Sequence, residues 1–316
     1  MKPNVCVDAG SEYCPCYLAE TKDCILCSHL KGDKVCDCLW QGVCIYNKFI
    51  KNNEKAMEFK KDILVDIKDC YEILDNVYLL ELNIPKELGE ELINPGSYVF
   101  LRGGEKVEEK FNIPISVTDV DLKQNILKVV VAIRGPKTKE ILRSKKIYIR
   151  APYKNGIFGL KYLKMLQDSK ALLLSAGIAQ VTLIKIIKQL LKNNNEVVVI
   201  IDKNKRRVEY IENYILSNKH IKFMHLDFNT DIETIKNEIN DNVKLVYSGG
   251  SNTFNKKVMD IVDSIDESIS LVISNNNLMC CGEGICGACA VKINDQVVKA
   301  CKTQIEPRLY LKGALK

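Results

Sequence analysis

The sequence lacks a long hydrophobic run, because no stretch of about 18 apolar residues occurs in its 316 positions. We therefore expect no membrane-crossing helix. The opening residues, MKPNVCVDAGSEYCPC, contain no apolar segment of the kind that a secretion signal needs, so we expect no signal peptide. Internal repeats and low-complexity tracts are also missing, and 47% of the residues are hydrophobic, which is ordinary for a globular chain.

Charge of one sign is not concentrated in any large block. The 46 Lys and Arg residues and the 40 Asp and Glu residues are interleaved and give a net charge of +6. The densest basic run is KNKRR, from Lys203 to Arg207, and a run of this length is usually a solvated face. The charge pattern predicts neither a nucleic-acid partner nor a membrane partner.

Cysteine, in contrast, is abundant, with fourteen residues gathered mainly at the two ends of the chain. Without a secretion signal, this usage predicts a reducing compartment and hence a cytoplasmic protein. In such a compartment, clustered cysteines indicate metal binding more often than disulfide bonds.

The pattern of apolar residues divides the chain into four parts. Residues 1–50 are rich in cysteine and show little periodicity, and residues 51–62 follow as a polar connector or short helix. Residues 60–155 hold short runs of Val, Ile and Tyr separated by Pro, Gly and Asn, which predict a small antiparallel barrel. Residues 165–275 alternate between strand and helix patterns, which predicts a parallel sheet of the dinucleotide-binding type. Residues 276–316 form a second cysteine-rich part.

The stretch CCGEGICGACAVKINDQVVKAC, residues 280–301, has cysteine spacing typical of a plant-type [2Fe–2S] site, C-x4-C-x2-C followed by a distant fourth cysteine. Three glycines between the cysteines allow the backbone to approach a cluster and to aim N–H groups at its sulfurs. A structural zinc site is the alternative, but it usually needs two C-x2-C pairs, and only one is present. The predicted ligands are Cys281, Cys286, Cys289 and Cys301, and Cys280 is interpreted as a packing residue.

The first part of the chain cannot hold a hydrophobic core alone, so we predict that thiolate–metal bonds stabilise it. Its C-x2-C pair, Cys24 and Cys27, is the strongest single element. Zinc and [4Fe–4S] both use four thiolates, so the metal, and whether there are one or two sites, remain open. The candidate ligands are Cys14, Cys16, Cys24, Cys27, Cys36, Cys38 and Cys44.

The order of these parts and the sequence MCCGEGICGAC, residues 279–289, resemble the electron-transfer subunit of dihydroorotate dehydrogenase and related sulfide or dihydroorotate dehydrogenase-like FAD/NAD-binding proteins. The resemblance covers roughly residues 60–305. It implies the ferredoxin–NADP reductase superfamily fold, with an antiparallel flavin barrel, a Rossmann-like α/β domain and a C-terminal [2Fe–2S] loop. It also implies FAD, NAD(P)H and a partner oxidoreductase subunit.

Several barrel positions match that family. IPISV, residues 113–117, is similar to R-P-x-S-[IV], with Ser116 retained but Ile113 in place of an Arg that contacts the FAD pyrophosphate in the family. RGPKT retains Thr138, and APYKNGIFG retains Asn155 and Gly156. The resemblance therefore implies a flavin site that lacks one charge-assisted contact.

The nucleotide-binding positions depart further from the family. LLLSAGIAQV occupies the place of a G-G-G-I-G loop and retains Gly177, while YSGG, with Ser248 and Gly249, resembles the C-G-P corner near the nicotinamide. Asp202 would suit the ribose of NAD, whereas the basic residues of 203–207 would suit the 2′-phosphate of NADP. The choice of nucleotide is open.

Two functions follow. In the first, the chain is an electron-transfer subunit, part of an FAD- and iron–sulfur-dependent oxidoreductase, that passes electrons between NAD(P)H/FAD and a partner oxidoreductase through the [2Fe–2S] cluster. In the second, it is a non-catalytic iron–sulfur scaffold or partner-binding subunit with degenerate flavin and nucleotide sites, as Ile113 and the SAGIAQ turn suggest. We assign no catalytic residue.

Overall fold

The computed structural model describes residues 5–38, 40–104, 112–239 and 242–314. The chain divides into two compact units. Unit 1 combines residues 1–61 with residues 277–314, and unit 2 contains residues 62–276. Each cysteine-rich end of the sequence therefore belongs to unit 1, while the barrel and the α/β part form unit 2.

The barrel of unit 2 closes in the strand order β2-β3-β6-β5-β4-β7, with neighbouring strands antiparallel. Alternate side chains of these strands fill its interior, because successive residues of a strand face opposite sides. The prediction of an antiparallel barrel is confirmed. Its strands are β2 (Ile63–Leu74), β3 (Val77–Asn83), β4 (Tyr98–Gly103), β5 (Ile113–Asp121), β6 (Ile126–Ala132) and β7 (Lys146–Tyr153), with helices α3 (Lys86–Leu92) and α4 (Pro136–Arg143) between them.

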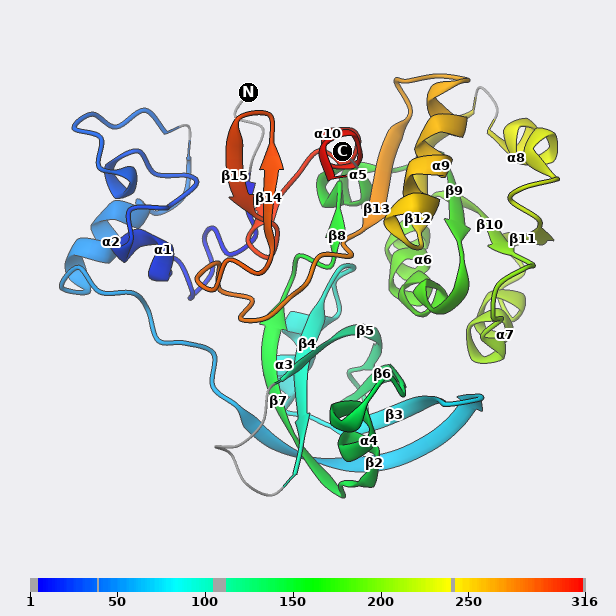
Figure 1. Cartoon of the computed structure of the whole chain (residues 1–316), viewed down its shortest axis with the longest axis horizontal. Coiled ribbons are helices and arrows are strands. Elements are labelled where there is room, and N and C mark those ends of the chain that lie inside the picture. Colours follow the sequence, from blue (N-terminus) through cyan, green and yellow to red (C-terminus); the bar gives the residue numbers. More distant parts are fainter. Residues whose placement is uncertain (1–4, 39, 105–111, 240–241, 315–316) are drawn as a thin grey trace. The chain divides into compact units, whose positions relative to one another are not determined.

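The α/β part of unit 2 is a sheet in the order β11-β10-β9-β12-β13-β8, parallel except for the edge strand β8. Its central strands are buried runs of Val, Ile and Leu covered by helices, as a parallel sheet requires (Figure 1). The predicted α/β fold is confirmed. The strands are β8 (Ile157–Phe158), β9 (Lys170–Ser175), β10 (Glu196–Asp202), β11 (Ile221–Leu226), β12 (Val243–Gly249) and β13 (Ser270–Ser274). The helices are α5 (Leu160–Met165), η2 (Gly177–Thr182), α6 (Leu183–Lys192), α7 (Glu209–Leu216), α8 (Ile232–Glu238) and α9 (Asn252–Asp263).

Unit 1 is held together by backbone pairing between the two ends of the chain. Strand β1 pairs antiparallel with β16, with Cys6 opposite Thr303, and the N–H of Val7 donates to the carbonyl of Lys302 at 2.9 Å. A hairpin, β14 with β15, carries the C-terminal cysteine loop, and α10 packs against β14 (Figure 1). The elements are β1 (Val5–Cys6), α1 (Tyr17–Glu20), η1 (His29–Lys31), α2 (Ile45–Lys51), β14 (Ala290–Ile293), β15 (Gln296–Lys299), β16 (Thr303–Gln304) and α10 (Pro307–Ala314).

The connector expected at residues 51–62 holds no helix of its own. Helix α2 starts earlier, at Ile45, and ends at Lys51, where the sequence becomes strongly polar. In the part of the chain that the structure describes, no helix is long and apolar enough to cross a membrane.

Candidate functional site

The C-terminal cysteine loop is shaped by glycine. Gly282, Gly284 and Gly287 have φ angles of 74°, 78° and 75°, in the left-handed region that favours glycine. Strand β14 begins directly after Cys289, and β15 ends shortly before Cys301, so the hairpin returns the fourth cysteine to the loop. Cys289 and Cys301 are buried, whereas Cys286 is exposed at the rim.

The four thiols of this loop interact with one another. Hydrogen bonding with Cys301 lowers the pKa of Cys281 to about 4 and the pKa of Cys289 to about 7, while the same bonds raise the pKa of Cys301. The backbone N–H of Glu283 also donates to the Cys281 sulfur at 3.3 Å, which favours a thiolate. Hydrogen bonding therefore favours the thiolate at Cys281 and Cys289, whereas burial raises the pKa of Cys286 and the bonds to its neighbours raise the pKa of Cys301.

A buried network of four charged side chains surrounds the loop. The ammonium of Lys302 contacts Asp8 and lies 3.1 Å from Glu283, while Lys60 lies 3.7 Å from Asp8 and 3.3 Å from Glu283. The two lysine side chains are each 1% exposed, and Asp8 and Glu283 are 9% and 12% exposed. Because two cations balance two anions, the charges can be buried together. The network joins the N-terminal segment to the cluster loop.

The N-terminal cysteines differ in their surroundings. Cys14 and Cys27 are buried within a small apolar cluster, while Cys36 and Cys38 bring their sulfurs to 3.6 Å from each other. Burial raises the pKa of the Cys6 thiol to about 12 and that of Cys14 to about 11. Among the described residues, which include all fourteen cysteines, there is no disulfide, and no three His, Cys, Asp or Glu side chains converge on one ion position. The N-terminal metal site stays a prediction.

The predicted flavin residues of the barrel also have structural roles. Thr138 caps α4, since its hydroxyl accepts from the N–H groups of Arg134 and Gly135 at 2.9 and 3.1 Å. The carbonyl of buried Asn155 accepts from the Asn275 side chain at 2.7 Å. A Cβ at Gly156 would lie 2.7 Å from a backbone carbonyl oxygen, so packing alone requires glycine there. These three positions are explained by the fold and do not by themselves show that flavin binds.

Ile113 lies on the side of the barrel wall that faces the core. Ile113 pairs with Leu101 of β4, and its side chain packs against the barrel interior. Ser116 pairs with Tyr98 of β4, and its side chain lies on the outer face of the wall. An arginine at position 113 would therefore meet apolar packing in this backbone. Packing inside the barrel therefore accounts for the isoleucine at the position where the family has an arginine.

The face that carries Ser116 offers a different cation. Arg150 of β7 is opposite Phe100, and its guanidinium lies 5.3 Å from the centre of that ring. Its Nε is buried and has no hydrogen-bond partner in the described part of the chain. Sequence reasoning missed Arg150, although the alternation of KIYIRAPY could have placed it on the face opposite the isoleucines.

Two other arginines near the barrel, Arg102 and Arg134, are less well placed than Arg150. Arg102 donates to Asp62 at 3.0 Å, lies over the Tyr148 ring and has a side chain only 2% exposed. Arg134 precedes α4 rather than lying on a strand. The charge of Arg102 is already balanced within the barrel.

On the nucleotide side, Gly177 is the position most open to a ligand. It follows β9 with a φ of 61°, and a Cβ added there would meet nothing within 4 Å. Ser248 donates to the side chain of Asn255 at 2.8 Å, and the carbonyl of Gly249 accepts from the N–H of Ala176 at 2.9 Å. Only Gly177 of these three has the free approach that a pyrophosphate requires.

The residues that bear on nucleotide choice are largely engaged. Asp202 ends β10 and accepts from the N–H of Asn204 at 3.0 Å. Lys203 pairs with Asp231 at 3.1 Å, and Arg207 donates to both carboxylate oxygens of Glu212. The basic run therefore contributes mainly to contacts within the chain, which weakens the argument for a 2′-phosphate.

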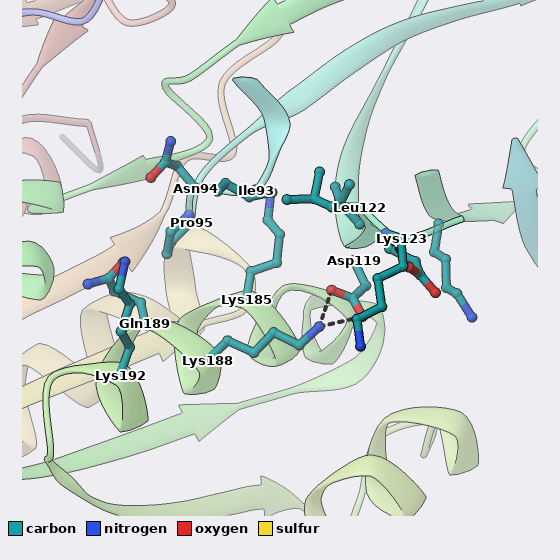
Figure 2. Close-up of a pocket in the computed structure, with 13 residues that line it drawn as sticks. Ile93, Asn94, Pro95, Asp119, Leu122, Lys123, Lys185, Lys188, Gln189 and Lys192 are labelled. Carbon is teal, nitrogen blue, oxygen red and sulfur yellow. Dashed lines mark hydrogen bonds and ion pairs between the residues drawn. The ribbon is translucent and has the colours of Figure 1, made fainter. Parts of the chain in front are cut away.

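A cavity of about 520 Å³ lies between α6 and the end of β5 (Figure 2). Lys188 pairs with Asp119 there at 2.5 and 2.7 Å, and the Nζ of Lys185 donates to the carbonyl of Leu92 at 2.9 Å. Burial lowers the pKa of Lys185 well below its usual value. None of the predicted cofactor residues lines this cavity, and no sequence motif indicated it.

Comparison with known proteins bears directly on these observations. A family described as "2Fe-2S iron-sulfur cluster binding domain" matches residues 202–311, which include the four cysteines of the C-terminal loop. The electron transfer subunit of dihydroorotate dehydrogenase B (NAD(+)) from Fusobacterium nucleatum is 27% identical over 241 residues, covering 72% of this chain and 90% of its own. The corresponding subunit from Clostridium perfringens is 24% identical over 261 residues, covering 78% and 95%. The predicted resemblance is confirmed.

Solved structures agree with the fold. An NADH-dependent reduced ferredoxin-NADP oxidoreductase aligns with a TM-score of 0.60 at 18% identity, covering 79% of this chain and 92% of its own. Phthalate dioxygenase reductase aligns with a TM-score of 0.51 at 11% identity, covering 78% and 95%. The fold of this chain is therefore similar to that of these two reductases. The individual ligand and cofactor-binding residues remain predictions.

Proposed function

We propose that this chain is an electron-transfer subunit that accepts reducing equivalents from NAD(P)H through FAD and passes single electrons to a partner oxidoreductase. A flavin can take two electrons and release them one at a time, and a [2Fe–2S] cluster carries one. The cofactors supply this chemistry, while the protein binds, orients and shields them. The electron-transfer role agrees with the relatives that the chain resembles.

The observation that carries the proposal is the C-terminal loop. Cys281, Cys286, Cys289 and Cys301 have the plant-type spacing, hydrogen bonding links their thiols, and three left-handed glycines expose the backbone around them. We assign these four cysteines as the ligands of one [2Fe–2S] cluster. We infer that this loop serves electron transfer rather than structural stabilisation alone.

The flavin would bind on the barrel face that carries Ser116, with Thr138, Asn155 and Gly156 shaping the adjoining loops. Arg150 lies on the same face and is our candidate for the charge-assisted contact to the pyrophosphate, in place of the arginine that Ile113 replaces. The nucleotide would approach at Gly177, with Ser248 and Gly249 at the neighbouring strand end.

The alternative function is a scaffold that binds the cluster and a partner but no flavin. Two observations favour it: the fold alone accounts for Thr138 and Gly156, and the turn after β9 contains a single glycine, Gly177. It differs from the first proposal in one measurable property, the presence of bound FAD.

We further propose that the protein works in the cytoplasm with an oxidoreductase subunit that contains the catalytic site. The fourteen unpaired thiols suit a reducing compartment. In the relatives named above, an electron transfer subunit serves dihydroorotate dehydrogenase B. The acceptor of this chain can differ from theirs, because fold alone does not determine function.

The test is anaerobic purification of the full chain, followed by flavin, iron and acid-labile sulfide analysis and by titration with NADH and NADPH. We expect FAD, a [2Fe–2S] EPR signal that appears on NAD(P)H addition, and reduction of a one-electron dye. Cluster without flavin at micromolar FAD would establish the scaffold function instead. Zinc without sulfide would overturn both.

A further inference from the structure

Four cysteines of unit 1 line one cavity outside the C-terminal loop. Cys6, Cys14, Cys16 and Cys24 line one small cavity of about 20 Å³, and the rest of its wall is mainly apolar. This set differs from what the sequence indicates. It includes Cys6, which lies outside the predicted segment, and it separates Cys24 from Cys27, its partner in the C-x2-C pair, because Cys27 is not among the lining residues.

We propose that Cys6, Cys14, Cys16 and Cys24 hold one [4Fe–4S] cluster, distinct from the C-terminal [2Fe–2S] cluster. The proposal adds a site to the proposed function, which uses only the C-terminal cluster. Its ligands come from strand β1, the loop that precedes α1 and the turn that follows α1.

The separation of the four sulfurs favours a cluster over a single ion. Four sulfurs about 2.3 Å from one zinc ion leave no space between them. Here the sulfurs do not converge on one ion position in the described residues, and the cavity has room for a water-sized sphere, which needs about 10–15 Å³. In a cluster, iron and inorganic sulfide lie between the cysteine sulfurs and hold them further apart.

Backbone donors and a buried cation suit a negatively charged group at this site. N–H groups of Asp8, Gly10 and Leu18 are directed at the sulfurs of Cys6, Cys14 and Cys16, respectively. Such bonds stabilise iron–sulfur clusters and tune their potentials.

The ammonium of Lys302 lies within electrostatic range of both Cys6 and Cys16. Asp8 also lines the cavity, and Lys302 pairs with it, so a charge-balanced network lies beside the four thiols.

The same features place the new site beside the C-terminal cluster. Cys6 is opposite Thr303 in the β1–β16 pair, two residues beyond the ligand Cys301. Leu18 lies 3.1 Å from where a Cβ of Gly284 would be, so the segment after Cys16 packs directly on the cluster loop. Two clusters so close would interact magnetically when both are reduced.

The first experiment uses wild-type full chain, purified anaerobically and reduced with dithionite. We expect more iron and acid-labile sulfide than one [2Fe–2S] cluster accounts for. We also expect a fast-relaxing [4Fe–4S] EPR signal at low temperature, and splitting of the [2Fe–2S] signal by its neighbour. Stoichiometric zinc, iron that the [2Fe–2S] cluster explains completely, or two signals without splitting would overturn the proposal. None of these outcomes removes the C-terminal cluster, so the proposed function is tested separately.

The second experiment assigns the ligands. Cys6→Ser and Cys16→Ser should each abolish or shift the [4Fe–4S] signal, whereas Cys27→Ser should retain it. Cys70→Ser is the matched control, because Cys70 is an exposed cysteine of unit 2. Loss of the signal in Cys27→Ser with retention in Cys6→Ser would overturn the ligand set. The [2Fe–2S] signal reports folding of unit 1 in each variant. Where a variant also loses the [2Fe–2S] signal, the splitting of that signal in the wild-type protein decides whether a second cluster is present.

Discussion

Replacement of Lys302 by Met tests how the two ends of the chain are held together. Methionine is similar in length but uncharged, so Asp8 and Glu283 would keep Lys60 as their only cation within the network. Breaking a buried ion pair by removing one partner costs about 3–5 kcal/mol. Lys60 still compensates one of the two carboxylates, so we expect a loss at the lower end of that range, about 3 kcal/mol. The equilibrium constant for opening of unit 1 should then rise roughly a hundredfold.

Native-state hydrogen exchange on the full chain measures this opening. The amide of Val7, which donates to the Lys302 carbonyl, and the amide of Ala300, which donates to the Cys289 carbonyl, are the reporters. Amides of β10 in unit 2 should keep their wild-type rates. Lys292→Met is the matched control, since Lys292 is exposed on β14 and its replacement should cost less than about 0.5 kcal/mol.

The pH dependence of the same network has a definite sign. Burial by itself lowers the pKa of Lys302, but Asp8 and Glu283 together raise it well above the usual value. A raised pKa in the folded state means that the stabilisation is fully present below the unfolded pKa of about 10.4 and is lost as pH rises through the folded pKa.

If Lys302→Met matched the Lys292→Met control in exchange rates at neutral pH, the network would not be what joins the two ends, and the reasoning would fail.

Four further outcomes are expected. Cys286→Ser should remove or shift the [2Fe–2S] EPR signal of the reduced protein, and an unchanged spectrum would show that Cys286 is not a ligand. Arg150→Gln should weaken FAD binding about 10- to 100-fold in titrations of apoprotein, because a charge-assisted bond contributes about 1.5–3 kcal/mol; equal affinity would remove Arg150 from the site. Gly156→Ala should lower the free energy of unfolding by about 1–3 kcal/mol in urea, because its Cβ would lie 2.7 Å from a carbonyl oxygen, whereas the control Gly135→Ala has open space and should change little. Burial lowers the pKa of Lys185, so unit 2 should become more stable as pH rises towards about 10.4, and Lys185→Met should flatten that slope between pH 7 and pH 9; an unchanged slope would assign it to other groups.

The sequence alone predicted the features that depend on local pattern. The barrel strands follow from alternating Val, Ile and Tyr between turn residues, and the α/β sheet follows from buried runs that alternate with helical spacing. The C-terminal hairpin also follows a local pattern, since it turns at Asn294, where φ is 53°, a conformation that asparagine tolerates. Short helices such as α3, α4 and α10 were missed, because seven or eight residues give too little periodicity to identify them.

The tertiary structure decided which face of a strand each candidate occupies. Ile113 and Ser116 are three residues apart, so they lie on opposite sides of the barrel wall, and only the register with β4 and β7 shows that Arg150 shares the side of Ser116. A sequence motif does not show which face of the wall a residue occupies. The register of paired strands does, and it determines which cation can reach a ligand.

Spacing along the chain identified the C-terminal cysteines, because their ligand loop is local and its glycines lie between the ligands. The N-terminal cysteines are different. Their spacing favoured Cys24 with Cys27, yet the cavity gathers Cys24 with Cys6, which pairing with Thr303 at the far end of the chain brings into place. Pairing with a strand so distant in sequence produces no local pattern. In the sequence, Asp8 and Lys302 resemble ordinary surface charges, and only the folded chain shows that they form a buried ion pair.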